Sequence, residues 1–300
     1  MTTQNTNLPN QSINWRAYWS LCKPRVLREI VYATIVGIFL SVPGTPPWGL
    51  AFWAILGITL AAASAAAANQ IIEYKIDAEM GRTSGRPLPL GEITPRQAII
   101  FSVTLGILSM LVMIKFTNLL ATVLTFFTLI GYAIVYTVYL KPATPQNIVI
   151  GGVTGAAPPV LGWCAITGSI DPHAWLLSLI IFVWTPPHFW ALAIARLDDY
   201  RIVAEKIPVL PVTDGIPITQ LHIFLYTILL FVVGLLPYVT HMSGLIYLVG
   251  AVGFGGLFMY QAWLLKQDAS PRVAWKTFAI SLVYLIGIFA ALLLDHYIKI

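Results

Sequence analysis

The sequence predicts an all-α fold: a polytopic bundle of nine transmembrane helices, with its N-terminus in the cytosol and its C-terminus outside. Three observations support this prediction. Hydrophobic residues make up 58% of the chain and charged residues only 10%, with a mean hydropathy of +0.81, a composition that soluble domains of this size do not tolerate. The other two are a series of apolar stretches and an uneven division of basic residues between the loops.

The apolar stretches define the expected helices, because a membrane span needs roughly 20 apolar residues. They form one domain, 21–300, behind a polar tail, 1–20, that we expect to be disordered. The start of the tail lacks Arg and Lys and resembles neither a signal peptide nor a transit peptide, so we expect a bacterial inner membrane protein. The expected spans are 26–43, 48–69, 97–115, 118–139, 147–167, 174–196, 219–239, 244–265 and 273–294.

The basic residues test this count, since Lys and Arg gather in cytosolic loops. Nine spans place all of them on one side except Lys115 and Lys299. The acids gather on the same face, except Asp171 and Asp295, although topology does not require this of acids. The cytosolic face is therefore the candidate active face. The net charge of +5 is scattered among short loops and forms no basic patch, so we expect no nucleic-acid partner.

The densest group of charges, 69–89, directly follows the second span. If the helix continues, then Asn69, Glu73 and Asp77 share one face at four-residue intervals. Such oxygens, followed by Arg82 and Arg86, suit Mg²⁺ bridged to a diphosphate. A solvated loop with weakly paired charges is the alternative.

A second acidic segment follows the sixth span, where Asp198 and Asp199 come after Arg196. Acids at the C-terminus of a helix oppose the helix dipole. Their repeated placement at cytosolic helix ends favours a compensating cation, with coincidence as the alternative.

Within the sixth span, His188 follows the prolines of 186–187. Tandem prolines break or kink a helix and free its carbonyl groups, which at this depth must face protein or a wet cavity. His188 could bind iron, carry a proton or contact a substrate, whereas a hydrogen bond between helices is the structural alternative.

The segment 141–163 begins with Lys141 and Asn147, continues with small residues and contains the prolines of 158–159. Small residues allow close approach of a neighbouring helix or of a flat ligand. Two broken helices facing each other would favour a pocket. Also on the cytosolic face, Lys23, Arg25 and Arg28 could bind phosphate or anionic lipid, and Tyr132 and Tyr136 could be ligands or interfacial aromatic residues.

Together these segments resemble the UbiA superfamily of intramembrane prenyltransferases, from about residue 21 to residue 294. The superfamily signature is an NxxxDxxxD-type motif, here with Glu73 at a position usually held by Asp, and Asp199 is the residue carried over in the second motif. More specific segments resemble the haem-farnesylating branch. They are KPR at 23–25, IDAEMGRTSGRPLP at 76–89, TPQNIVIGGVTGAAPPVLGW at 144–163, WTPPHFWALAI at 184–194 and DDYRIVAEKIPVLPV at 198–212.

The resemblance implies transfer of the farnesyl group of farnesyl diphosphate to a vinyl group of haem b, with addition of water, to give haem O. It implies Mg²⁺ as cofactor, membrane lipid as surroundings and a haem A synthase as a partner. The implied metal-binding and catalytic residues are Asn69, Glu73, Asp77 and Asp199; the implied substrate-binding residues are Lys23, Arg25, Arg82, Arg86, Lys141, Asn147 and His188.

Two alternatives remain. Another UbiA-type enzyme would use the same metal chemistry on an aromatic or chlorin acceptor. A transporter of haem or another small molecule would also use broken helices and polar groups inside the membrane. The odd number of spans, the lack of an inverted repeat and the gathering of acids on one face disfavour the transporter.

Overall fold

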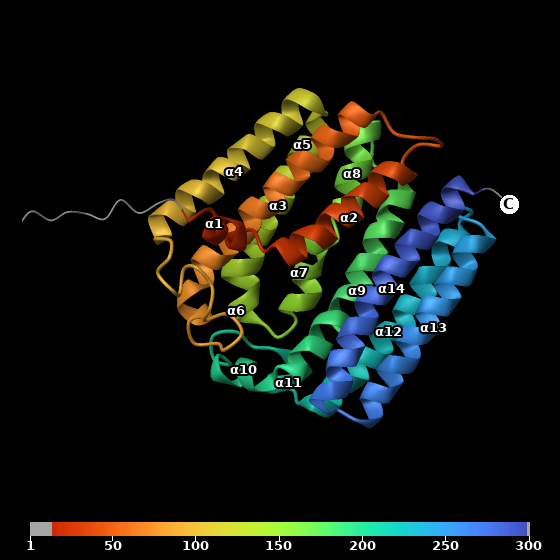
Figure 1. Cartoon of the computed structure of the whole chain (residues 1–300). Helices are drawn as coiled ribbons and strands as arrows, with labels where there is room; N and C mark the ends of the chain where they lie inside the picture. Colours follow the sequence, from red (N-terminus) through yellow and green to blue (C-terminus); the bar gives the residue numbers. More distant parts are fainter. Residues whose placement is uncertain (1–13, 299–300) are drawn as a thin grey trace, which may run out of the picture.

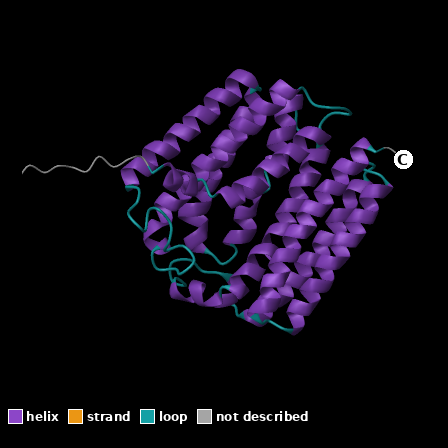
Figure 2. Ribbon diagram, viewed as in Figure 1, coloured by secondary structure: helices purple, strands orange, loops and turns teal. Residues whose placement is uncertain are grey.

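The chain forms a bundle of long helices, shown by a computed structural model that describes residues 14–298 (Figure 1). All regular elements in this range are helical (Figure 2). They are α1 (Trp15–Leu21), α2 (Pro24–Leu40), α3 (Trp48–Asp77), α4 (Pro95–Phe116), α5 (Leu119–Ile130), η1 (Gly131–Leu140), α6 (Lys141–Ala143), α7 (Asn147–Gly155), α8 (Pro158–Thr167), α9 (Pro172–Ala195), α10 (Leu197–Ile202), α11 (Leu210–Thr213), α12 (Ile216–Val239), α13 (Leu245–Gln267) and α14 (Pro271–Tyr297).

Eight helical segments of the described chain are long and apolar enough to cross a membrane. They include α5 to α6 as one segment and α7 with α8 as another. The first predicted span corresponds to α2, which has 17 residues and is shorter than these eight. Helix length therefore supports a polytopic membrane protein and eight of the nine predicted spans.

The helices pack as two groups joined through α7, α8 and α9. In the first group α3 packs on α4 and α2 on α8, and in the second α13 packs on both α12 and α14, with α9 against α12 and α14. Figure 1 shows the second group as a row of near-parallel helices at the right. The short helices α10 and α11 lie at the same end of the bundle as α6 and the loop after α3 (Figure 1).

Local sequence signals begin several helices. Thr94 at the N-cap and Gln97 at the third position of α4 form a reciprocal capping box, and Pro95 occupies the first position. Asn118 accepts the Ala121 N–H to cap α5 and also donates to the Cys164 carbonyl oxygen at 2.8 Å, which ties α5 to α8.

The predicted disordered tail, 1–20, is partly helical. Residues 1–13 lie outside the described residues, but Trp15–Ser20 are helical rather than disordered. The Asn14 side chain accepts the Ala17 N–H, and Ala17 and Leu21 are buried in a cluster with residues of α3 and α4. Burial of these apolar residues, together with the cap, supplies the stabilisation that the sequence pattern did not reveal.

The two proline pairs behave differently. Pro158 and Pro159 lie at the break between α7 and α8, as predicted. Pro186 and Pro187 lie inside an uninterrupted α9, so the expectation of two broken helices facing each other was wrong. Prolines inside a membrane-spanning helix are tolerated because neighbouring helices provide alternative hydrogen-bond partners for the freed backbone groups.

Close helix approach explains much of the small-residue content. A Cβ added to Gly37 of α2 would lie 2.2 Å from the Pro159 carbonyl oxygen of α8, and one added to Gly162 of α8 would lie 2.5 Å from the Thr34 carbonyl oxygen. Only glycine permits this backbone contact between α2 and α8.

Candidate functional site

One buried face of α3 carries the predicted acidic motif. The helix continues to Asp77, and Asn69, Glu73 and Asp77 are at most 5% exposed. Ile72 and Lys75, which lie between them in sequence, are exposed. The prediction that the three motif residues share one face of a continuing helix is therefore confirmed.

Each motif residue on this face pairs with a base from another part of the chain. The bases come from the start of α2, from α6 and from the loop between α3 and α4. We call these six residues the acid–base row. The pairs are Lys23 Nζ with Asn69 Oδ1, Lys141 Nζ with Glu73 Oε1 at 2.5 Å, and an Arg86 guanidinium nitrogen with Asp77 Oδ2.

Local structure positions the bases. Lys23 adopts a left-handed backbone, with φ of 49°, immediately before Pro24 begins α2. The loop that carries Arg86 is fixed to the end of α3, because the Thr83 hydroxyl donates to the Asp77 carbonyl oxygen at 2.9 Å. The row therefore depends on backbone geometry at the helix ends as well as on charge.

Lys23 lies in a crowded positive environment. Burial and the nearby Arg86 charge lower the pKa of Lys23 to about 7, although Glu73 and Asp77 oppose this shift. A bound anion would favour the protonated form of Lys23, since opposite charge raises the pKa of an amine. A negatively charged ligand would therefore be stabilised beside Lys23.

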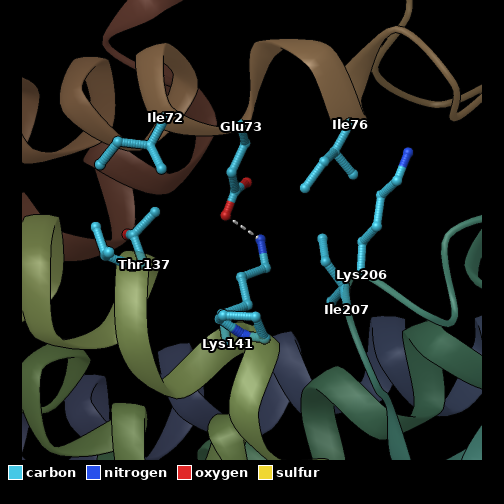
Figure 3. Close-up of a pocket in the computed structure, with 9 residues that line it drawn as sticks. Ile72, Glu73, Ile76, Thr137, Lys141, Lys206 and Ile207 are labelled. Carbon is cyan, nitrogen blue, oxygen red and sulfur yellow. Dashed lines mark hydrogen bonds and ion pairs between the residues drawn. The ribbon is translucent and has the colours of Figure 1, made fainter.

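A cavity of about 170 Å³ opens beside the Glu73–Lys141 pair (Figure 3). Figure 3 shows both polar groups pointing toward each other between apolar side chains from α3 and from the segment before α11. Ile76 and Ile207 are among these apolar side chains, and Thr137 of η1 also lines the cavity. The charged pair therefore lies at the wall of a mainly apolar space.

The second acidic segment contributes one inward carboxylate. Within residues 14–298 the buried Asp199 Oδ2 has no hydrogen-bond partner, whereas Asp198 is exposed and pairs with Arg201 at 3.3 Å. A Cβ added to Gly81, in the loop after α3, would lie 3.2 Å from Asp199 Oδ1. Asp199 thus lies against the loop that follows the first acidic motif.

The residues fit Mg²⁺ in donor chemistry. Among residues 14–298, no cluster of three or more His, Cys, Asp or Glu side chains is grouped closely enough to hold a metal. Glu73 and Asp77 are instead held by bases, and Asp199 Oδ2 is buried with no hydrogen-bond partner in the described part of the chain. All four predicted ligands offer oxygen, as Mg²⁺ requires. Because Glu73 and Asp77 are paired with Lys141 and Arg86, binding of Mg²⁺ would require these bases to release them.

The loop after α3 and the segment between α10 and α11 are joined by an ion pair. Lys206 Nζ contacts both carboxylate oxygens of Glu79 at 2.6 Å. Beside this pair, Met80 is buried in an apolar cluster with Val203 and Ile207. The sequence does not indicate this pair, because nothing in the local pattern around Glu79 identifies a partner 127 residues away.

The remaining predicted bases lie apart from these contacts. Arg25 and Arg82 are exposed, and over residues 14–298 neither forms an ion pair.

His188 belongs to α9, and its side chain packs against α14. It is 4% exposed, its Nδ1 is 2.6 Å from Ser281 Oγ, and its ring stacks between Trp184 and Phe278 at centroid distances of 4.1 and 4.4 Å. These contacts match the structural alternative, a satisfied hydrogen bond between helices, and leave Nε2 as the ring nitrogen for any substrate contact.

Asn147 joins α7 to the segment before α11. Its Nδ2 donates to the Thr144 carbonyl oxygen at 2.6 Å and to the Pro208 carbonyl oxygen at 3.0 Å. Both amide protons are thus used on backbone, and Oδ1 remains as its acceptor.

A π-helix carries residues that the sequence reasoning missed or left open. Within η1, Tyr132 and Tyr136 stack with centroids 5.3 Å apart, and Thr137 contacts Asn69. π-helical turns are rare and occur frequently at functional sites. The sequence offers one indication that Thr137 belongs to the site. It lies four residues before Lys141, which places it one helical turn from that base.

The chain matches one protein family and resembles several known proteins. Residues 30–290 match the UbiA prenyltransferase family. The chain is 62% identical to a protoheme IX farnesyltransferase of Methylococcus capsulatus, with 99% of both chains covered. It is 56% identical to a protein of the same name from Nitrosococcus oceani, with 95% of both chains covered.

Solved structures with similar folds are more distant in sequence. A structure of a digeranylgeranylglyceryl phosphate synthase matches with a TM-score of 0.77 at 19% identity, covering 94% of this chain and 98% of the other. A UbiA homologue from Archaeoglobus fulgidus, bound to GPP and Mg²⁺, matches with a TM-score of 0.63 at 16% identity, covering 92% and 99%. At these identities the likeness is one of fold.

Proposed function

Because the chain belongs to the UbiA prenyltransferase family, we propose that it transfers the farnesyl group of farnesyl diphosphate to a vinyl group of haem b. Water adds in the same overall reaction, and the product is haem O. The observation that carries this proposal is the 62% identity to a protoheme IX farnesyltransferase over 99% of both chains. The protein is accordingly a prenyltransferase with several membrane-spanning helices.

We propose the acid–base row as the diphosphate site. Asn69, Glu73, Asp77 and Asp199 would hold Mg²⁺, and the bases of the row would then face phosphate oxygens. The ion, when bound, would supply positive charge beside the departing diphosphate oxygen. Support comes from the oxygen-only donor set, from the buried Asp199 Oδ2, which has no partner among the described residues, and from the location of three bases within reach of the motif.

The protein side chains would promote loss of the leaving group by stabilising developing negative charge. As the allylic carbon–oxygen bond breaks, its electron pair leaves with the diphosphate, and Lys23, Arg86 and Lys141 offset that charge. The vinyl group of haem b then supplies the electron pair for the new carbon–carbon bond. Water adds to the resulting cation and loses a proton, which completes the hydroxyethylfarnesyl group.

Exclusion of bulk water is the second role of the site. The allylic cation would react with water before reaching the haem if the cavity were open. Ile76 and Ile207 line the cavity beside Glu73, and the Glu79–Lys206 pair joins the two loops beside it. These apolar walls and joined loops support a shielded reaction site.

The acceptor contacts are a further part of the proposal. His188 would contact haem through Nε2, since Nδ1 is bonded to Ser281, and Asn147 would contact it through Oδ1. Arg25 and Arg82, both exposed, would meet the diphosphate or the haem carboxylates only on entry.

The division of basic residues between loops supports an inner-membrane orientation with the acid–base row, and the N-terminus, on the cytosolic side and the C-terminus outside. A haem A synthase is the proposed recipient of the product.

The test is an incubation of purified protein with haem b, farnesyl diphosphate and Mg²⁺, followed by chromatographic separation of the haems. We expect haem O to form and to require all three additions. If a well-folded preparation gives none while an active control enzyme does, the proposal fails. Farnesylation of an aromatic or chlorin acceptor instead would identify the alternative UbiA-type activity.

A further inference from the structure

Thr137 contacts the first residue of the acidic motif from a different helix. Asn69 Nδ2 lies 3.3 Å from Thr137 Oγ1, and both side chains are buried, at 2% and 4% exposed. Thr137 belongs to the π-helix η1, and its hydroxyl also lies 2.8 Å from the carbonyl oxygen of Tyr132, five residues earlier. One hydroxyl therefore links the turn of η1 to the amide of Asn69.

Proton bookkeeping fixes the direction of both hydrogen bonds. The Tyr132 carbonyl oxygen can only accept, so the single Thr137 hydroxyl proton is donated to it. The Thr137 oxygen can then only accept, and the group that it meets on Asn69 must be the amide N–H. The carbonyl oxygen of the Asn69 side chain is consequently directed away from η1.

A second contact requires the same orientation. When Lys23 is protonated, its ammonium group has no lone pair and can only donate, so its partner on Asn69 is then Oδ1. Two independent neighbours thus orient one amide, whose nitrogen faces Thr137 and whose oxygen faces the bases.

These two contacts differ when a cation arrives. Mg²⁺ at Asn69 would repel the Lys23 ammonium from Oδ1, because like charges compete for one acceptor. Thr137 is neutral and approaches the opposite end of the amide, so its contact persists. Without it, a rotated Asn69 would present N–H groups, which cannot bind a cation.

We propose that Thr137 is a positioning residue that holds the Asn69 amide with its oxygen toward the metal–diphosphate site. This inference rests on the proposed function, which makes Asn69 a ligand. Residues that orient a metal ligand typically contribute about 10–100-fold to metal affinity.

The test measures the Mg²⁺ concentration that half-saturates binding of farnesyl thiolodiphosphate, a non-reacting analogue, by calorimetry on the full-length protein in detergent. Thr137→Val keeps the shape and removes the hydroxyl, and it should raise this concentration about tenfold or more. Thr137→Ser keeps the hydroxyl and should bind like the wild type.

A matched control is Thr227→Val. Thr227 is 1% exposed and donates only to the Ile223 carbonyl oxygen of its own helix, α12. This change should leave Mg²⁺ dependence unaltered. In an Asn69→Ala background, Thr137→Val should produce no further loss, because the amide that it orients is absent.

The outcomes separate the two claims. If Asn69→Ala does not alter Mg²⁺ dependence, the ligand role of Asn69 in the proposed function is refuted. If Asn69→Ala weakens binding but Thr137→Val does not, the positioning role alone is overturned. An equal loss from Thr137→Val with and without Asn69 would also overturn it, since Thr137 would then act only by stabilising η1.

Discussion

Removal of the Lys141 charge tests whether the buried Glu73–Lys141 ion pair contributes more to the stability of the protein than an exposed ion pair does. Lys141→Met keeps a long unbranched side chain but removes the ammonium group that pairs with Glu73. The Glu73 side chain is 7% exposed, so its carboxylate is left buried without this partner. Breaking a fully buried pair costs about 3–5 kcal/mol; Lys141 is 20% exposed, so we expect about 2–3 kcal/mol. Thermal unfolding in detergent should show a Tm lowered by roughly 4–8 °C.

The chain supplies a matched control for this experiment. Lys206 also pairs with a glutamate, Glu79, at 2.6 Å, but the two side chains are 49% and 42% exposed. Exposed pairs contribute about 0.2–1 kcal/mol, so Lys206→Met should lower the Tm by no more than about 2 °C. Equal shifts in the two variants would refute the argument that burial of Glu73 makes its pair with Lys141 strong.

The other variants concern the motif and the packing of η1. Asp77→Ala should lower haem O formation at least 100-fold while leaving expression intact, because it removes a proposed ligand and frees Arg86; normal turnover would refute the metal assignment. Gly151→Ala would place a Cβ 2.2 Å from the Tyr136 ring and should destabilise the protein by about 1–3 kcal/mol. Gly155→Ala in the same helix is its control in thermal unfolding, because the added Cβ would meet no side chain or other element of the described chain within 4 Å; similar losses would contradict the packing argument.

Sequence periodicity was sufficient to predict the acidic face of α3. A helical repeat relates Asn69, Glu73 and Asp77 directly, and the structure confirms that the three are buried while Ile72 is exposed. The apolar stretches likewise predicted helices near the observed positions, because the membrane demands a continuous apolar length.

Partner identity was beyond the sequence because it depends on chain topology. Lys23 and Lys141 were predicted only as bases of the active face, yet each contacts one particular motif residue, 46 and 68 positions away. The π-helical form of η1 has no simple residue signature, so the contact between Thr137 and Asn69 could not be anticipated.

The proline pairs show the limit of local rules. Pro158 begins α8 just after the break that follows α7, as its missing N–H favours, whereas Pro186 lies inside α9. The difference arises from the surrounding helices, which a local pattern does not contain.

The most direct test of the acid–base row as a metal–diphosphate site is the affinity of Mg²⁺ with and without farnesyl diphosphate. The acids are held by bases in the structure, so Mg²⁺ alone must compete with Lys23, Lys141 and Arg86. Diphosphate would draw these bases away, and we expect Mg²⁺ to bind at least about tenfold more tightly in its presence, a coupling of about 1.4 kcal/mol. Equal Mg²⁺ affinity in the two titrations would contradict the account.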